Sequence, residues 1–210
     1  GANTTGTLNT AVGSNALLAN TTANANTAVG SESLKTNTTG HSNTAVGDES
    51  LKLNQTGDKN TAIGNDALLA NTADNNTAVG NAALTANTTG GDNVAVGGNS
   101  LDANTTGDAN TCIGKSSLGN NTTGANNTGL GWGSLGQNTT ANNNVSVGYN
   151  CLGANTTGTQ NVAVGAYTLD ANTTGNDNTA LGYISLSDVT TGVQNTAVGS
   201  RALQDMSTGD

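Results

Sequence analysis

The sequence predicts an all-β tandem-repeat solenoid, a β-roll or β-helix of twelve coils with about 17 residues each. Three regularities predict it: an anchoring Asn at a nearly constant interval, a Gly four residues after every anchor, and a Leu four residues after that Gly. Helix is excluded because Gly, Asn and Thr are poor helix formers and no 3.6-residue period links the apolar positions. Short strands joined by corners at a fixed period stack as hydrogen-bonded coils, which places identical residues in columns.

We number each copy from its anchoring Asn as position 0. Every step between anchors is 17 residues except the step from Asn60 to Asn76, which is 16, so we expect a one-residue deletion in a loop between them. The anchors are Asn9, Asn26, Asn43, Asn60, Asn76, Asn93, Asn110, Asn127, Asn144, Asn161, Asn178 and Asn195.

The repeat predicts which positions form strands and corners. Positions +1 (Thr or Val) and +3 (Val, Ile or Leu) lie on one face of a strand, and the residue at +3 is expected to join the Leu at +8 in the interior. The Gly at +4, from Gly13 to Gly199, predicts a corner with positive φ or a close backbone approach. The Asn-Thr-Thr-Gly block at +11 to +14, intact at residues 37–40, is expected to form a second short strand.

Position +2 bears on the oligomeric state. It is Ala in nine copies and otherwise Cys112, Gly129 or Ser146. Small residues on this strand face indicate close packing against another chain or against the opposite wall of the same coil. Two large apolar residues per coil offer little burial, so we expect partner chains in a parallel homotrimer, with a single-chain solenoid as the alternative.

The ends of the sequence lie within further copies of the motif, at residues 1–6 and 207–209. Solenoids need capped ends. We therefore expect residues 1–210 to be a single repeat region, uncapped at both ends, that belongs to a longer fibre or stacks end to end into a filament.

Composition argues against several classes of function. A net charge of −9 with only five Lys and Arg residues disfavours nucleic acid and anionic membranes as partners, and no apolar run is long enough to insert in a bilayer. His41 is the sole histidine, and no nucleophile or carboxylate recurs beside it, so we expect no enzyme, no cofactor and no metal site. Cys112 and Cys151 occupy different repeat positions, and we expect no disulfide between them.

Several segments resemble known repeats. Residues 92–97 (Asp-Asn-Val-Ala-Val-Gly) and 160–165 (Gln-Asn-Val-Ala-Val-Gly) resemble the Asn-Ser-Val-Ala-Ile-Gly motif of trimeric autotransporter adhesin heads. The fuller pattern, Asn-Thr-Ala-Val-Gly…Leu…Asn-Thr-Thr-Gly, is similar to repeat regions of phage tail-fibre-like proteins. The resemblance covers essentially the whole chain and implies a left-handed, trimeric β-roll that is extracellular, on a cell surface or on a virion. The longer period and the frequent Thr at +1 depart from the adhesin heads.

Three functions follow as hypotheses. The first is a structural fibre or shaft segment. The second is an adhesin module that binds a surface or a cell-surface glycan through a candidate ligand stripe at +5 and +6; the alternative for these aromatics is a cross-coil ladder that stabilises a corner. The third is ice binding by Thr at +13, present in eleven copies and broken only at Ala73. The candidate stripe consists of Trp132, Tyr149, Tyr167 and Tyr183.

The Asn-Thr-Thr blocks also create sequons for N-glycosylation, for example at Asn20, Asn104 and Asn155. The competing explanation, which we favour, is that Asn and Thr serve corner hydrogen bonding and strand propensity.

Overall fold

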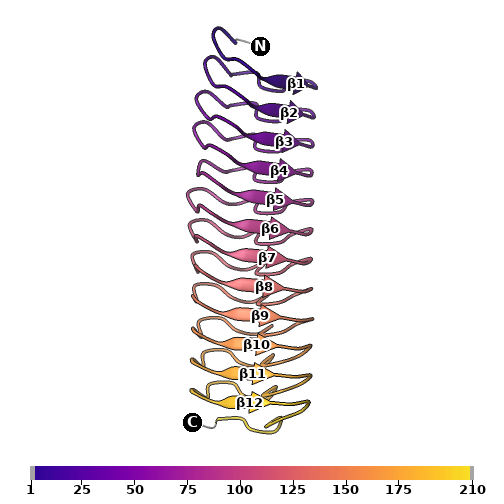
Figure 1. The fold of residues 1–210 in the computed structure, drawn as a ribbon, viewed down its shortest axis with the longest axis vertical. Helices are drawn as coiled ribbons and strands as arrows, with labels where there is room; N and C mark the ends of the chain where they lie inside the picture. Colours follow the sequence, from indigo (N-terminus) through magenta and orange to yellow (C-terminus); the bar gives the residue numbers. More distant parts are fainter. Residues whose placement is uncertain (1–2, 209–210) are drawn as a thin grey trace.

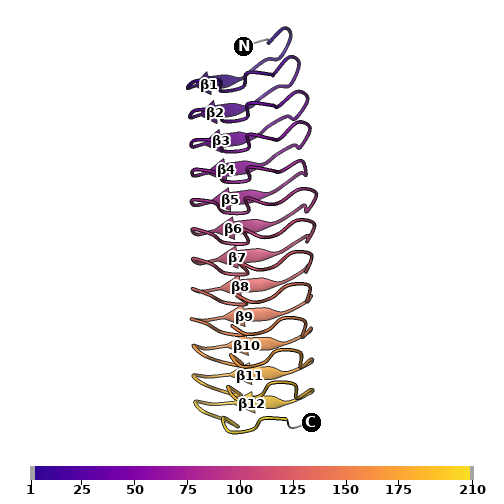
Figure 2. The ribbon, with the colours of Figure 1, turned by 180° about the vertical axis from the view of Figure 1, so that it is seen from behind.

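The computed structural model describes residues 3–208 and confirms the predicted fold class, an all-β solenoid whose coils stack into a straight rod with the termini at opposite ends (Figures 1 and 2). Each coil contributes one three-residue strand to a single parallel sheet of twelve strands in sequence order. Residues 3–208 contain no helix that is long and apolar enough to cross a bilayer. The strands are β1 (Thr10–Val12), β2 (Thr27–Val29), β3 (Thr44–Val46), β4 (Thr61–Ile63), β5 (Thr77–Val79), β6 (Val94–Val96), β7 (Thr111–Ile113), β8 (Thr128–Leu130), β9 (Val145–Val147), β10 (Val162–Val164), β11 (Thr179–Leu181) and β12 (Thr196–Val198).

The sheet is in register by repeat position throughout, so identical residues form the predicted columns. Thr10 pairs with Thr27, and Thr61 pairs with Thr77 across the 16-residue step. The deletion lies in the loop, as predicted. The Asn71 amide donates to the Ala73 carbonyl at 2.8 Å, as the amides at +11 in other coils donate to the carbonyl at +14, so Ala73 takes the +14 place and one Thr is missing.

The strands face the opposite way from the prediction. Every residue at +2 from Ala28 onwards is buried, whereas the large residues at +3 are half-exposed or exposed. A Cβ added to Gly129 would lie 2.5 Å from Leu118 Cδ1 and 2.5 Å from Ser117 Oγ, so position +2 packs against positions +7 and +8 of the opposite wall. The interior is therefore wide enough only for a small residue and one Leu, and the residue at +3 points to solvent.

The Asn-Thr-Thr-Gly block forms a bend and not the predicted second strand. The backbone N–H groups of Thr38 and Thr39 both donate to the carbonyl of Gln55 in the next coil, at 3.0 and 3.1 Å. Because two successive amides converge on one acceptor, the alternating hydrogen-bond pattern of a strand cannot develop.

The corners depend on backbone conformations with positive φ. The Gly at +4 has φ between 130° and 144°, as the sequence predicts, and the Leu at +8 recurs in the left-handed region near 50°. A left-handed Leu is unfavourable by about 1–2 kcal/mol. Burial of its side chain and a backbone bond to the next coil, 3.0 Å for Leu34 N to the Ser50 carbonyl, hold it in place.

Two columns of buried Asn amides run along the interior. Each anchor from Asn9 to Asn178 ties its own coil closed and receives a backbone N–H from the next: Asn43 Nδ2 donates to the Gly57 carbonyl at 2.8 Å, and Asn43 Oδ1 accepts from Asn60 N at 2.9 Å. In the +11 column, Asn104 Nδ2 donates to Asn87 Oδ1 at 2.8 Å and to the Gly107 carbonyl at 3.0 Å. Both columns therefore converge on the carbonyl at +14.

The +11 ladder ends where the sequence changes. Val189 replaces Asn in the coil after Asn172. Among the described residues, Asn172 Oδ1 is the one buried side-chain polar atom without a hydrogen-bond partner. The ladder thus forms only where each coil supplies the next amide.

The corner geometry predicts that Gly97→Ala destabilises the rod by about 3 kcal/mol or more. Its φ is 133°, and an added Cβ would lie 2.7 Å from the Gly114 carbonyl. The matched control is Gly98→Ala at +5, where Ala166 occurs in another coil, φ is not positive, and the nearest atom to an added Cβ would be the Asn81 carbonyl oxygen at 3.9 Å. Denaturant unfolding measures both variants, and an equal loss in the two would contradict the assigned role of the corner.

The +11 ladder predicts that Asn104→Val lowers the free energy of unfolding by about 1–3 kcal/mol, because it leaves Asn87 Oδ1 without a hydrogen-bond partner in a buried site. The reciprocal change, Val189→Asn, supplies a donor to Asn172 Oδ1. We expect it to leave the free energy of unfolding unchanged or to raise it. Thermal unfolding of both variants gives the comparison. Asn104→Val with wild-type stability would show that the ladder is dispensable.

Candidate functional surfaces

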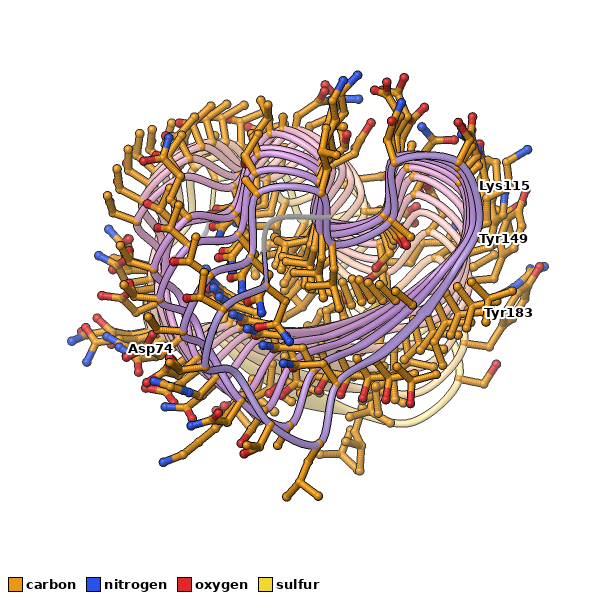
Figure 3. All side chains as sticks on the ribbon, turned by 90° about the horizontal axis from the view of Figure 1, so that it is seen from above. Asp74, Lys115, Tyr149 and Tyr183 are labelled. Carbon is orange, nitrogen blue, oxygen red and sulfur yellow. The ribbon has the colours of Figure 1, made fainter. Side chains whose placement is uncertain are left out.

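The long sides of the rod differ in chemistry. All five basic and 14 acidic residues fall at positions +5 to +10 or +14 to +16, and none falls at +1 or +3. We call positions +1 and +3 the strand face, positions +5, +6, +9 and +10 the aromatic edge, and positions +15 and +16 the acidic edge. In the view along the rod, Lys115, Tyr149 and Tyr183 of the aromatic edge lie on one side and Asp74 of the acidic edge lies on the opposite side (Figure 3).

The strand face is uncharged along its whole length. Position +1 is Thr or Val, and position +3 is Val, Ile or Leu, in all twelve copies. Large apolar side chains remain exposed in the middle of the rod, among them Ile113 at 45%. A continuous stripe of half-exposed and exposed apolar side chains at +3, beside the uncharged Thr and Val of +1, is typical of an interaction surface.

The aromatic edge brings together the residues that the sequence placed in one stripe. Trp132 stacks on Tyr149 with ring centroids 5.0 Å apart and planes 12° apart, and Tyr149 meets Tyr167 edge-on at 5.2 Å. Tyr183 lies in the next coil and lines a depression with Tyr167. All four rings are exposed. The predicted cross-coil arrangement is thus present, and it leaves ring surface open to solvent.

A depression beside Trp132 escaped the sequence prediction. It has a volume of about 400 Å³ and opens to solvent. Its signal in the sequence is a run of glycines at +9 in three successive coils, where other copies carry Leu, Lys, Thr, Asp, Ser or Gln. These glycines are Gly119, Gly136 and Gly153.

A second depression lies between Tyr167 and Tyr183, with a volume of about 590 Å³ and an acidic floor. Asp170 and Asp188 both line it. Loss of hydration raises the pKa of Asp170 above its ordinary value. Two carboxylates at this site disfavour an anionic ligand.

The same edge carries an ion-pair cluster nearer the N-terminus. Lys52 contacts Glu32 at 2.7 Å and Glu49 at 3.0 Å, and Lys35 contacts Glu32 at 2.7 Å. Hydrogen bonds from Lys35 and Lys52 lower the pKa of Glu32 to about 2. The cluster links two successive coils through half-exposed side chains.

The acidic edge contains a third hydrogen-bond ladder. Asp58 Oδ1 accepts from His41 N at 2.6 Å, Asp74 Oδ1 accepts from Asp58 N at 2.7 Å, and His41 Nδ1 accepts from Asn24 N at 2.9 Å. These side chains therefore satisfy backbone groups of the preceding coil. Within residues 3–208, no group of three or more His, Cys, Asp or Glu side chains could hold a metal ion.

The cysteines and the sequons belong to the interior. Cys112 and Cys151 are free and buried, and burial raises the pKa of the Cys112 thiol and raises that of Cys151 to about 11. Asn20, Asn104 and Asn155 are almost completely buried with their Nδ2 groups hydrogen-bonded, which bears out corner hydrogen bonding as the role of these Asn residues.

Comparison of the chain with known protein families, with curated proteins and with solved structures finds no match in any of the three. We therefore infer function from the surfaces of the solenoid.

The ion-pair cluster predicts a pH-dependent contribution to stability. Because the pKa of Glu32 falls from about 4.5 to about 2 on folding, its contribution is complete above pH 4.5 and is lost as the pH falls toward 2. Relative to wild type, Glu32→Gln should lower the melting temperature slightly at pH 7, and the difference should vanish near pH 2. Melting curves across this range, with 1 M NaCl as the screening control, test it; a constant difference between the two proteins would refute it.

Proposed function

We propose that this chain is a structural fibre or shaft segment of an extracellular or virion-associated filament or tail fibre. The observation that carries the proposal is the uncharged apolar strand face, which extends over every coil. Its length, about 53 Å for eleven steps of about 4.8 Å between strands, suits lateral packing of parallel rods.

Self-association through the strand face gives a parallel homotrimer. Each chain would turn its residues at +1 and +3 toward the common axis and leave the charged edges in solvent. This arrangement supplies the apolar burial that the narrow coil interior lacks, since that interior holds mainly small residues, Leu and hydrogen-bonded Asn. End-to-end stacking into a filament is the second form of self-association that we consider.

Two other functions have supporting observations. A surface- or glycan-binding adhesin module is favoured by the exposed rings of the aromatic edge and the depression beside them. Ice binding, the third candidate, is favoured by the exposed column of Thr at +13, which the missing Thr before Ala73 interrupts. Thermal hysteresis that disappears when several of these Thr residues are replaced would support ice binding.

The fibre proposal predicts a particle of about three times 20.4 kDa in light scattering. Ile113→Glu should weaken assembly at least tenfold, because it places three carboxylates at the common axis. Side-chain exposure of Ile113 lets the single chain keep its fold. The matched control is Ser116→Glu on the aromatic edge of the same coil, which should remain trimeric.

A monodisperse wild-type monomer would contradict self-association. Filaments of wild type that persist in Ile113→Glu would place the contacts at the ends of the rod and not on the strand face. Electron microscopy of the same samples separates these outcomes.

A further inference from the structure

We infer that the depression beside Trp132 is a binding site for an uncharged glycan. The inference goes beyond the fibre and deepens the adhesin candidate, on which it rests. Four features carry it: a locally carved slot, an exposed aromatic wall, a set of amide side chains, and the absence of basic residues from its lining.

The depression, which we call the slot, exists because three successive coils have no side chain at +9. At +9, bulky residues such as Lys35, Lys52 and Leu69 occupy the corresponding surface of earlier coils. Gly119, Gly136 and Gly153 remove those side chains in consecutive coils beside the aromatic stack. A cross-coil ladder alone explains why the rings stack, but it does not require empty space next to them. The volume, about 400 Å³, falls within the usual range for small-molecule sites.

Trp132 provides the apolar wall. Tyr149 stacks on one face of the indole, and 48% of Trp132 remains exposed. Stacking fixes the ring before any ligand arrives, so little side-chain entropy is lost on binding. The C–H faces of a pyranose ring are apolar and match such a platform, whereas its hydroxyl groups need hydrogen-bond partners at the rim.

Amide side chains supply those partners. Asn120 Nδ2 donates to Gln137 Oε1 at 3.1 Å, which orients both amides. Asn120 Oδ1 and Gln137 Nε2 have no partner within residues 3–208, so one acceptor and one donor remain available on residues that line the depression. Asn99 Nδ2 contacts Asp102 Oδ2 at 3.3 Å, and both residues line the same depression.

Charge selects the class of glycan. Asp102 is the only ionisable residue in the lining, and neither Lys nor Arg contributes to it. A carboxylate or sulfate on the ligand would meet this negative charge and no Lys or Arg in the lining, on a chain with a net charge of −9. The site therefore fits neutral hexose or N-acetylhexosamine residues and disfavours sialylated or sulfated ones.

The test uses the full chain on an array of immobilised neutral oligosaccharides of glucose, galactose, mannose and N-acetylglucosamine, with sialylated and sulfated oligosaccharides beside them. Wild type should bind at least one neutral oligosaccharide and none of the anionic ones. Trp132→Ala should weaken that binding at least tenfold. Gly136→Leu should do the same while retaining the aromatics, because it fills the slot with a residue that +9 already carries in Leu18 and Leu69.

The matched control is Tyr183→Ala, which removes an exposed ring of the same edge outside the depression and should leave binding unchanged. Circular dichroism and melting curves of each variant confirm folding. Undiminished binding by folded Gly136→Leu, or preference for anionic oligosaccharides, would overturn the site. Binding lost only in Tyr183→Ala would keep the adhesin function but move the site to the second depression. No binding at all would overturn both the glycan site and the adhesin candidate. The fibre proposal would be unaffected, because light scattering tests the trimer separately.

Discussion

The structure depends on buried Asn amides that hydrogen-bond from coil to coil. The interior of each coil holds little apolar volume, so hydrophobic burial alone does not fix how one coil sits on the next. Directional bonds from the anchor column and the +11 column do so, because each amide reaches a neighbouring coil and its own carbonyl at +14. A shift by one residue would break both columns at once and leave buried polar groups unpaired, at a cost of about 1–3 kcal/mol for each.

This constraint separates the structural positions from the variable ones. Positions 0, +4 and +8 never change, whereas +5, +6, +9 and +10 hold anything from Gly to Trp. The outside of the rod can therefore acquire local features without disturbing the fold. The ion-pair cluster around Lys52 and the slot beside Trp132 lie on the same edge, several coils apart, and differ only in the residues at these variable positions. A long scaffold with local surface features can therefore accommodate both of the proposed roles, fibre and adhesin.

The period, the Gly corners, the buried Leu and the adjacency of the aromatic residues could all be predicted, because they follow from residue type and spacing. Alternation along β7 shows that Thr111 and Ile113 share a face, but not which face is inward; the width of the coil decides that, and width is a property of the whole turn. The bend at residues 37–40 could not be predicted, because it depends on Thr38 N and Thr39 N sharing the Gln55 carbonyl of the next coil. Residue types along one coil do not reveal that pairing. The slot could not be predicted from residue type, because Gly119, Gly136 and Gly153 create it by the absence of side chains.

Hydrogen exchange of the backbone amides, followed residue by residue, tests most directly whether the Asn columns hold the coils together. The anchor N–H groups from Asn43 to Asn178 donate to the preceding anchor's Oδ1 and should be among the slowest to exchange. Amides at +5, such as Asn65 N and Trp132 N, have no acceptor within residues 3–208 and should exchange fast. Anchor amides that exchange as fast as those at +5 would contradict the central role of the amide ladders.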